Sequence, residues 1–311
     1  PHRAVLVLLD FARAYDRVWR TALYAKMARM GVPGCVIQWI RALLSDRRAQ
    51  VRWDGTLSSS RTFQEGLPQG SVLAPLLWLC YVNDIDEEIP QDITRSLYAD
   101  DVALLATGRS PEECADKLQP CLDAIDRWLT KWKVTPSVSK CSSTLFSLDP
   151  KQGGGRCTPL LRLRGQQLEH VRTPTFLGLK LDTQLTFSEH VNDLKKKMAK
   201  RRQCLQALAG KSYGSHRRTI RTAYISYIRS LVDYSAAVVF AHAAPTVRDR
   251  LETEQNKCAR AITGCIRLTR RDALLAEADL PPLSLRGKQL AASEYQRMLR
   301  LHSDDPAHRL M

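Results

Sequence analysis

The chain has 311 residues, with 47 lysines and arginines against 32 aspartates and glutamates, a formal net charge of +15, and 44% hydrophobic residues. This apolar content is enough to build folded cores and indicates a globular protein. The longest apolar run, residues 72–82, contains Pro75 and falls short of the ~20 residues that a membrane-spanning helix needs. We therefore expect no membrane partner.

The positive charge is unevenly distributed along the chain. Residues 1–150 hold 18 basic and 18 acidic residues, whereas residues 151–311 hold 29 basic and 14 acidic ones. A neutral half with local acidic clusters, joined to a basic half, suits a metal-dependent enzyme that acts on a polyanion. The alternative is a basic surface that is only solvated.

The cysteines and the N-terminus bear on the compartment. Nine cysteines are present, an odd number, and none are arranged as Cys-x-x-Cys, which argues against a disulfide framework and a structural zinc site. No charged segment followed by an apolar one opens the chain, so we read no signal peptide. We expect an intracellular protein of the nucleus and cytoplasm that is not secreted.

The first predicted elements are a strand and a helix. Residues 4–9 are apolar, too few for a helix, and end at Asp10, which predicts a buried strand with a carboxylate at its tip. Residues 22–30 have helical periodicity, and the Gly-Val-Pro-Gly segment at residues 31–34 ends that helix.

A hairpin and an apolar helix are predicted next. Residues 50–53 and 56–63 flank an Asp-Gly pair, which is typical of a tight hairpin turn. A loop with three turn-forming residues, Gly66, Pro68 and Gly70, then leads into an apolar helix at residues 71–83.

A second hairpin carries acidic residues at its tip. Residues 96–98 and 102–106 are predicted strands, and Ala-Asp-Asp at residues 99–101 connects them. Residues 112–132 form an amphipathic pattern that predicts a long helix.

The remaining pattern divides the chain into a mixed part and a helical part. Three further strands are predicted, at residues 144–147, 160–163 and 175–181. Only helices are predicted after that, at residues 188–209, 216–241, 246–264 and 284–301. We therefore expect a mixed domain at residues 1–186 and an all-helical domain at residues 187–311.

Three carboxylates suggest metal chemistry. Joining nucleotides requires a 3′-hydroxyl nucleophile and a pyrophosphate leaving group, and two divalent ions ~3.5 to 4 Å apart can assist both. Such ions prefer carboxylate oxygens. Asp10 at a strand end and Asp100 and Asp101 at a hairpin tip could supply them if the elements share one sheet. Taken singly, an aspartate in a turn is more often simple turn chemistry.

The order of three motifs resembles the palm of reverse transcriptases, and more narrowly those of non-LTR (LINE-type) retrotransposons. The motifs are LDFARAYD at residues 9–16, LPQGSVLAP at 67–75 and YADD at 98–101. The resemblance continues in four later segments, SVSK at 137–140, FLGLKLD at 176–182, and residues 222–234 and 251–264. It implies an α+β polymerase palm, a ferredoxin-like split βαβ antiparallel sheet with helices on one face, followed by an all-helical thumb or connection domain.

The resemblance implies catalytic and metal-binding residues. Asp10 and Asp100 would be the main ligands of two Mg²⁺ ions, with Mn²⁺ as a possible substitute, and Asp101 an additional ligand or a supporting carboxylate. Lys140 would protonate the leaving pyrophosphate or stabilise its charge, although an exposed lysine is more often only solvated.

Substrate-binding and primer-binding residues follow in the same way. Phe11, Tyr15, Gln69 and Gly70 would contact the nucleotide or template. Tyr15 matches the bulky position that excludes a ribose 2′-hydroxyl, with an ordinary core aromatic as the alternative, and glycine at position 70 would permit close approach. The segment that resembles the primer grip comprises Phe176, Leu177 and Gly178.

The basic half of the chain would hold the nucleic-acid duplex through phosphate contacts. Nine residues on two predicted helices are candidates: Lys195, Lys196, Lys197, Lys200, Arg201, Arg202, Arg217, Arg218 and Arg221. Consecutive side chains point around a helix, so not all of them can touch one strand. Nuclear targeting is a competing interpretation of the cluster.

The sequence departs from the family pattern at two places. Ala74 stands where a serine often precedes the proline, and the usual Asn-x-x-Lys-Thr is SVSKC at residues 137–141. The chain begins immediately before the first catalytic strand, so we expect the fingers subdomain to be missing upstream, which leaves the activity of the isolated span open.

The expected function is that of an RNA-directed DNA polymerase of a non-LTR retrotransposon, a nucleotidyltransferase with an RNA template, a DNA primer and dNTPs as partners. An intron-maturase-type reverse transcriptase is one alternative. A catalytically inactive nucleic-acid-binding remnant is the other. No oligomeric state follows from the sequence.

Overall fold

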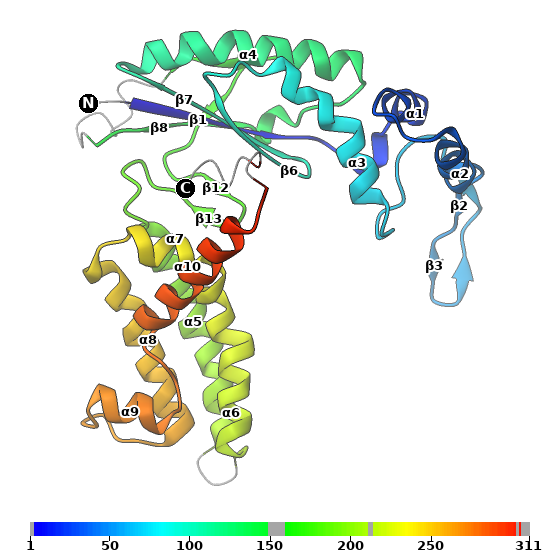
Figure 1. The fold of residues 1–311 in the computed structure, drawn as a ribbon. Coiled ribbons are helices and arrows are strands. Elements are labelled where there is room, and N and C mark those ends of the chain that lie inside the picture. The colour runs from blue at the N-terminus through cyan, green and yellow to red at the C-terminus, as the bar shows by residue number, and fades with distance from the viewer. Residues whose placement is uncertain (1–2, 149–158, 211–213, 303–304, 306–311) are drawn as a thin grey trace. The chain divides into compact units, whose positions relative to one another are not determined.

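The chain forms two compact units in the computed structural model, which describes residues 3–148, 159–210, 214–302 and 305 (Figure 1). The units are Pro1–Arg172 and Thr173–Met311. The boundary expected at residue 186 lies further along the chain, inside the second unit. Residues before position 186 belong with the helices because the backbone amide of Lys180 donates to Nδ1 of His190.

A five-stranded sheet organises the first unit. Its strands are β1 (Arg3–Asp10), β6 (Thr94–Tyr98), β7 (Asp101–Gly108), β8 (Ser142–Phe146) and β11 (Glu169–His170). The order across the sheet is β11-β8-β1-β7-β6, and every pair is antiparallel except β11 with β8. With helices α3 (Ala74–Val82) and α4 (Pro111–Lys131) between strands, this is the split βαβ arrangement of ferredoxin-like sheets. The expected α+β palm fold is confirmed.

The two faces of β1 have different environments. Val5 and Val7 are fully buried, and α4 lies along the sheet on one side (Figure 1). Leu8 and Asp10 alternate with them and are only partly buried, because successive side chains of a strand point to opposite faces. The strand therefore ends with Asp10 on the more open face.

A helical and hairpin segment is inserted between β1 and α3. It contains α1 (Arg20–Arg29), α2 (Gly34–Leu44) and four short strands, β2 (Arg48–Ala49), β3 (Arg52–Trp53), β4 (Thr56–Leu57) and β5 (Arg61–Thr62). The hairpin around the Asp-Gly pair was predicted correctly. Helix α2 was not predicted. The Gly-Val-Pro-Gly segment before it indicates the end of a helix, and the first turn of α2 carries glycine and β-branched residues, which disfavour helix formation.

Short elements complete the first unit: η1 (Tyr15–Arg17), η2 (Asn83–Glu88), η3 (Val138–Lys140), β9 (Arg162–Leu163) and β10 (Gln166–Gln167). Helix α4 begins at a capping arrangement in which Ser110 Oγ accepts from the Glu113 amide at 3.2 Å, while the Glu113 carboxylate accepts from the Arg109 amide at 2.7 Å. These two bonds supply acceptors for backbone N–H groups that have no partner within the helix at its N-terminus.

The second unit is a small hairpin followed by helices. Its elements are β12 (Thr175–Phe176), β13 (Leu179–Lys180), α5 (Ser188–Ala209), α6 (Arg217–Ala223), α7 (Ser230–His242), α8 (Pro245–Thr263), α9 (Arg271–Glu277) and α10 (Leu283–Leu299). The single strand expected at residues 175–181 is a hairpin, because Leu177 and Gly178 both have positive φ angles, 45° and 79°. The short helix α9 was not predicted.

The helix expected at residues 216–241 is interrupted by a π-helical turn. This turn, η4, spans Tyr224–Arg229 and separates α6 from α7. Arg201 of α5 donates to the Tyr227 carbonyl inside the turn, and an external donor of this kind takes the place of a regular helical bond. None of the helices in the described parts of the chain is both long enough and apolar enough to cross a bilayer.

A buried lysine links α1 to the rest of the first unit. Lys26 is 4% exposed and donates to the Asp84 carboxylate at 2.5 Å and to the Tyr81 carbonyl at 2.7 Å. Its ammonium group also lies 3.8 Å from the Trp132 ring centroid and 4.6 Å from that of Trp128. Burial lowers the pKa of Lys26 to about 8 despite the favourable effect of Asp84.

This burial predicts a pH-dependent stability. Between pH 8 and 10.5 the unfolded chain keeps the Lys26 proton and the folded chain loses it, so the free energy of unfolding should rise with pH in that window. From pH 8 to pH 9.5 we expect wild type to gain roughly 1 to 2 kcal/mol relative to Lys26→Met. Urea unfolding followed by tryptophan fluorescence measures this in the first unit, which holds all six tryptophans. Equal pH slopes for the two proteins would contradict it.

Candidate active site

Two acidic residues face each other at the end of the central strands. In the antiparallel pairing of β1 with β7, Asp10 lies directly opposite Asp101. Directly opposed residues point to the same face, with Cα atoms ~4.5 to 5.5 Å apart. The structure therefore brings together two carboxylates that lie far apart in the sequence.

The third carboxylate is positioned by the turn between β6 and β7. Asp100 follows Ala99, which has a positive φ of 53°. Nε1 of Trp78 on α3 donates to the Ala99 carbonyl at 2.8 Å. Trp78 is 1% exposed, so this bond fixes the hairpin tip from the core. Sequence analysis did not identify Trp78 as a residue of the site.

The electrostatics of the cluster are those of like charges held close together. The pKa of Asp101 is raised by burial and then by the negative charges of Asp100 and Asp10. Among the residues that the structure describes, no group of three or more acidic, histidine or cysteine side chains already has the geometry of a metal site. The carboxylates nevertheless fit hard divalent cations in donor type, and a cation would relieve their repulsion.

Lys140 lies next to the first aspartate. Its Nζ is 3.7 Å from Asp10 Oδ1, and its side chain is 69% exposed. The short helix η3 that carries Lys140 is anchored to β1, because the Ser137 amide donates to the Asp10 carbonyl at 2.8 Å. The structure thus places the predicted lysine beside the carboxylates while leaving its ammonium group accessible.

The two aromatic residues after Asp10 differ in position. Tyr15 is partly exposed and stacks on Trp78, with ring centroids 5.6 Å apart. Burial, and then the negative charge of Asp100, raise the pKa of Tyr15. Phe11 is 3% exposed and its ring lies 6.4 Å from that of Trp78. The Phe11 ring therefore supports the site from the core.

The Pro-Gln-Gly loop lies against the segment that follows Asp10. The Leu67 amide donates to the Tyr15 carbonyl at 2.7 Å, and Gln69 Nε2 donates to Asp16 Oδ1 at 2.9 Å. Gly66 has a φ of 80°, and a Cβ there would lie 2.4 Å from the Asp16 carbonyl oxygen. The close approach thus depends on Gly66. Gly70, which we expect to let a nucleotide or template approach closely, has a φ of 84° and open space around it.

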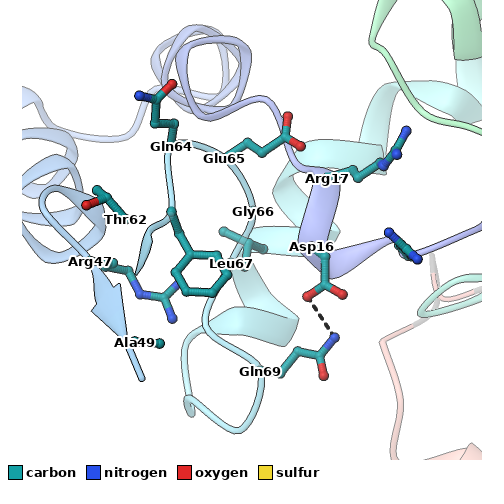
Figure 2. A pocket seen from close by; sticks show the side chains of 12 residues that line it. Asp16, Arg17, Arg47, Ala49, Thr62, Gln64, Glu65, Gly66, Leu67 and Gln69 are labelled. Carbon is teal, nitrogen blue, oxygen red and sulfur yellow. Dashed lines mark hydrogen bonds between the residues drawn. The ribbon is translucent and has the colours of Figure 1, made fainter. Parts of the chain in front are cut away.

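A pocket of about 650 Å³ lies beside this loop (Figure 2). Gln69 and Asp16 line one part of it, and three cationic residues, Arg13, Arg17 and Arg47, also line it. Glu65 lines the pocket as well, so its three arginines exceed its two carboxylates by one, and this positive excess suits an anionic ligand.

Arg20 is a second residue that sequence analysis missed. Its guanidinium group donates to four backbone carbonyls, those of Leu44 (2.7 Å), Phe63 (2.9 Å), Glu65 (2.9 Å) and Gly66 (3.0 Å). It thereby holds α1, the base of the hairpin and the start of the Pro-Gln-Gly loop together. One local feature of the sequence could have drawn attention to Arg20: it is a basic residue at the start of a helix, where the helix dipole favours acidic residues.

The segment expected to grip a primer lies in the second unit. Phe176, Leu177 and Gly178 form the tip of the β12–β13 hairpin. The hydroxyl of Tyr234 on α7 donates to the Leu177 carbonyl at 2.7 Å, and a Cβ at Gly178 would lie 3.3 Å from the Tyr234 ring. Tyr234 therefore fixes this turn, although no local sequence signal indicated it.

The nine basic candidates divide into two groups. Arg202 pairs with Glu254, Arg217 with Glu277, and Arg221 with Asp279. Lys197 pairs with Asp193 one turn earlier on its helix, and Arg201 lies over the Tyr227 ring. The other four candidates are exposed and form no ion pair within the described residues: Lys195, Lys196, Lys200 and Arg218. The second group is the more available for phosphate.

Residues 1–181 match the family described as reverse transcriptase (RNA-dependent DNA polymerase). The chain belongs to the reverse transcriptase family. It is 30% identical to the probable RNA-directed DNA polymerase from transposon BS of Drosophila melanogaster, over 98% of the chain and 34% of that protein. It is 28% identical to the RNA-directed DNA polymerase from mobile element jockey of the same species, over 99% of the chain and 33% of that protein. The resemblance to non-LTR retrotransposon enzymes is confirmed.

This reverse transcriptase chain thus spans about a third of the length of the curated relatives it matches. Among solved structures, it is similar to telomerase from Candida albicans in complex with a fragment of telomeric RNA, with a TM-score of 0.46 and 12% identity over 90% of the chain and 51% of that protein. It is also similar to apo telomerase from Candida tropicalis, with a TM-score of 0.44 and 12% identity over 98% of the chain and 52% of that protein.

The Trp78 bond to the hairpin tip generates a prediction for the reverse transcriptase site. Trp78→Phe keeps an aromatic ring but leaves the Ala99 carbonyl without its donor. We expect a loss of about 1 to 3 kcal/mol in the free energy of unfolding, because a partly buried acceptor loses its donor and the smaller ring leaves space in the core around position 78. Urea unfolding measures it, with Trp39→Phe on the exposed surface of α2 as the control. A Trp78→Phe protein as stable as the control would contradict this role.

Proposed function

We propose that the chain is the catalytic part of an RNA-directed DNA polymerase that adds dNTPs to the 3′-hydroxyl of a DNA primer on an RNA template. The observation that supports it most strongly is the cross-strand pairing of Asp10 with Asp101, next to Asp100. The family membership and the neighbouring Pro-Gln-Gly loop point to the same reaction.

The three carboxylates would hold two divalent cations, Mg²⁺ or Mn²⁺. Such cations lower the pKa of the attacking hydroxyl and neutralise the leaving pyrophosphate. In the reaction the 3′-oxygen forms a bond to the α-phosphorus, the bond from the α-phosphorus to pyrophosphate breaks, and the hydroxyl proton passes to water. Asp10, Asp100 and Asp101 would bind the cations through their carboxylate oxygens, and each contributes negative charge to that binding.

The surrounding residues would position the substrates. Lys140, exposed beside Asp10, would stabilise or protonate the pyrophosphate. The Tyr15 ring, held by its stack on Trp78, would block a ribose 2′-hydroxyl. Gln69 and Gly70 would contact the nucleotide or template from the loop. Exposed cations of the second unit would hold the duplex through phosphates. Action in the nucleus and cytoplasm stays a prediction.

Asparagine substitutions test the role of the carboxylates. We expect Asp10→Asn and Asp100→Asn to lower the rate of primer extension on an RNA template on the order of 10²- to 10³-fold, as loss of a preorganised charge does in other enzymes. The same variants should be as stable as wild type or more so, because like-charge repulsion is removed. Steady-state primer extension in the full-length protein and urea unfolding measure the two effects.

The matched control is Asp116→Asn, on the exposed surface of α4. Extension at the wild-type rate by both site variants would reject the proposed mechanism. It would favour a nucleic-acid-binding protein in which only the basic residues act.

The Tyr234 bond tests the primer grip. Tyr234→Phe removes one hydrogen bond to the Leu177 carbonyl, a net contribution of about 1 kcal/mol. We expect the KM for the primer to rise roughly fivefold, with little change in kcat, because the turn touches the primer and not the reacting atoms. Tyr295→Phe, on the exposed surface of α10, is the control. A fall in kcat at unchanged KM would argue against a primer-binding role for this turn.

A further inference from the structure

A narrow hairpin, residues 47–63, projects from the helices of the first unit (Figure 1). Its tip is the pair Asp54 and Gly55, with φ angles of 45° and 77°, the left-handed pair that tight hairpin turns require. Arg48 pairs with Thr62 and Ala49 with Arg61 near the base, and Arg52 pairs with Leu57 and Trp53 with Thr56 near the tip.

The two ladders are offset by one residue. The chain advances three positions from Ala49 to Arg52 but four from Leu57 to Arg61, so the second strand carries a β-bulge among its serines. Ser58 stabilises the bulge, since its hydroxyl accepts from the Val51 amide at 2.9 Å. The hairpin therefore holds a defined, twisted shape although all its paired residues are exposed.

Large apolar side chains on this hairpin have no core to enter. Trp53 beside the turn is 81% exposed, Val51 is 69% exposed and Leu57 is 54% exposed. An exposed indole on a rigid turn offers a flat surface on which a nucleobase can stack.

The same hairpin carries excess positive charge. It contains four arginines, Arg47, Arg48, Arg52 and Arg61, and a single acidic residue, Asp54. None of the four forms an ion pair within the described residues. The guanidinium group of Arg47 instead lies 5.9 Å from the Phe63 ring centroid. Arginines that no carboxylate neutralises are available for phosphates.

The base of the hairpin is continuous with the pocket beside the Pro-Gln-Gly loop. Arg47 and Phe63 line that pocket together with Gln69 and Asp16 (Figure 2). Alternation along the strands and the pairing of Ala49 with Arg61 place Arg47, Arg61 and Trp53 on one face of the hairpin, and Arg48 and Arg52 on the other. A strand that leaves the loop along the first face therefore meets Arg47, then Arg61 and finally Trp53.

We propose that this hairpin binds a single-stranded stretch of polynucleotide, the template ahead of the copied duplex, by stacking a base on Trp53 and by contacting phosphates with Arg47 and Arg61. The strand's identity as template rests on the proposed function. Aromatic stacking combined with unpaired cations is the chemistry by which proteins hold single strands without reading their sequence. A protein partner matches this surface less well, because four arginines with a single carboxylate favour a polyanion over an interface of mixed charge.

The test compares duplexes with and without a single-stranded template extension. Binding of a fluorescent primer–template duplex is measured by anisotropy without divalent ions or dNTPs, either blunt or with a 5′ template extension of about six nucleotides. We expect wild type to bind the extended duplex more tightly than the blunt one. Trp53→Ala should bind the extended duplex roughly five- to tenfold more weakly than wild type does, and should bind the blunt duplex as wild type does. The double variant Arg47→Ala, Arg61→Ala should reduce the salt slope of the extension's contribution by roughly 1.4, because each single-strand phosphate contact contributes about 0.7.

Two matched controls separate the hairpin from general effects. Trp39→Ala removes an exposed tryptophan of α2, outside the hairpin, and Arg127→Ala removes an exposed arginine of α4; both should bind like wild type. Circular dichroism and urea unfolding check that Trp53→Ala is folded. The proposal is overturned if Trp53→Ala binds the extended duplex as wild type does, or weakens blunt and extended duplexes equally.

Further arms identify the ligand and separate this proposal from the catalytic one. RNA and DNA extensions should both bind, since base stacking and phosphate contacts are common to them; an effect confined to DNA would overturn the template assignment. If Trp53→Ala instead abolishes self-association in analytical ultracentrifugation, the surface is a protein interface and the proposal fails. Asp10→Asn should retain the full effect of the extension, so a failure of the catalytic proposal leaves this measurement unchanged.

Discussion

The site depends on one register, the pairing of β1 with β7 that sets Asp10 opposite Asp101. Like charges directly opposed across strands are destabilising, so other interactions must hold this register. Val5, Val7 and Leu104, fully buried on the opposite face, do so, because a slip by one residue would turn all of them away from the core. The hydrophobic face thus stabilises an electrostatically unfavourable arrangement that the proposed reaction needs.

Much of this register could be predicted because its signals are local. The apolar run that ends at Asp10 predicts where the first strand ends, and the acidic turn at residues 99–101 predicts where the paired strand begins. Once both strands belong to one sheet, these two ends must lie side by side. Helices α4 and α5 were predicted to within a residue or two from amphipathic periodicity. The Asp-Gly turn was equally clear, because few residue pairs tolerate two positive φ angles.

The residues that sequence analysis missed act through long-range hydrogen bonds from their side chains. Trp78, Arg20 and Tyr234 each donate to backbone carbonyls remote in the chain. A carbonyl has no sequence signature, so such a donor looks like any other core or surface residue. The same limit applies to the basic residues. Arg218 and Arg221 lie on the same short helix and look alike in the sequence, but only the fold shows that Arg221 forms an ion pair with Asp279.

Residues 1–150 are neutral in sum, but their positive and negative charges are separated in space, and this separation has a mechanistic consequence. The carboxylates at the strand ends would repel a triphosphate or a polynucleotide, whereas Arg13, Arg17 and Arg47 beside the Pro-Gln-Gly loop would attract it. Arginines can hold the parts of a polyanion that do not react. They cannot bring its α-phosphate against three carboxylates, and for that step the proposed reaction requires cations between the two sets of negative charges.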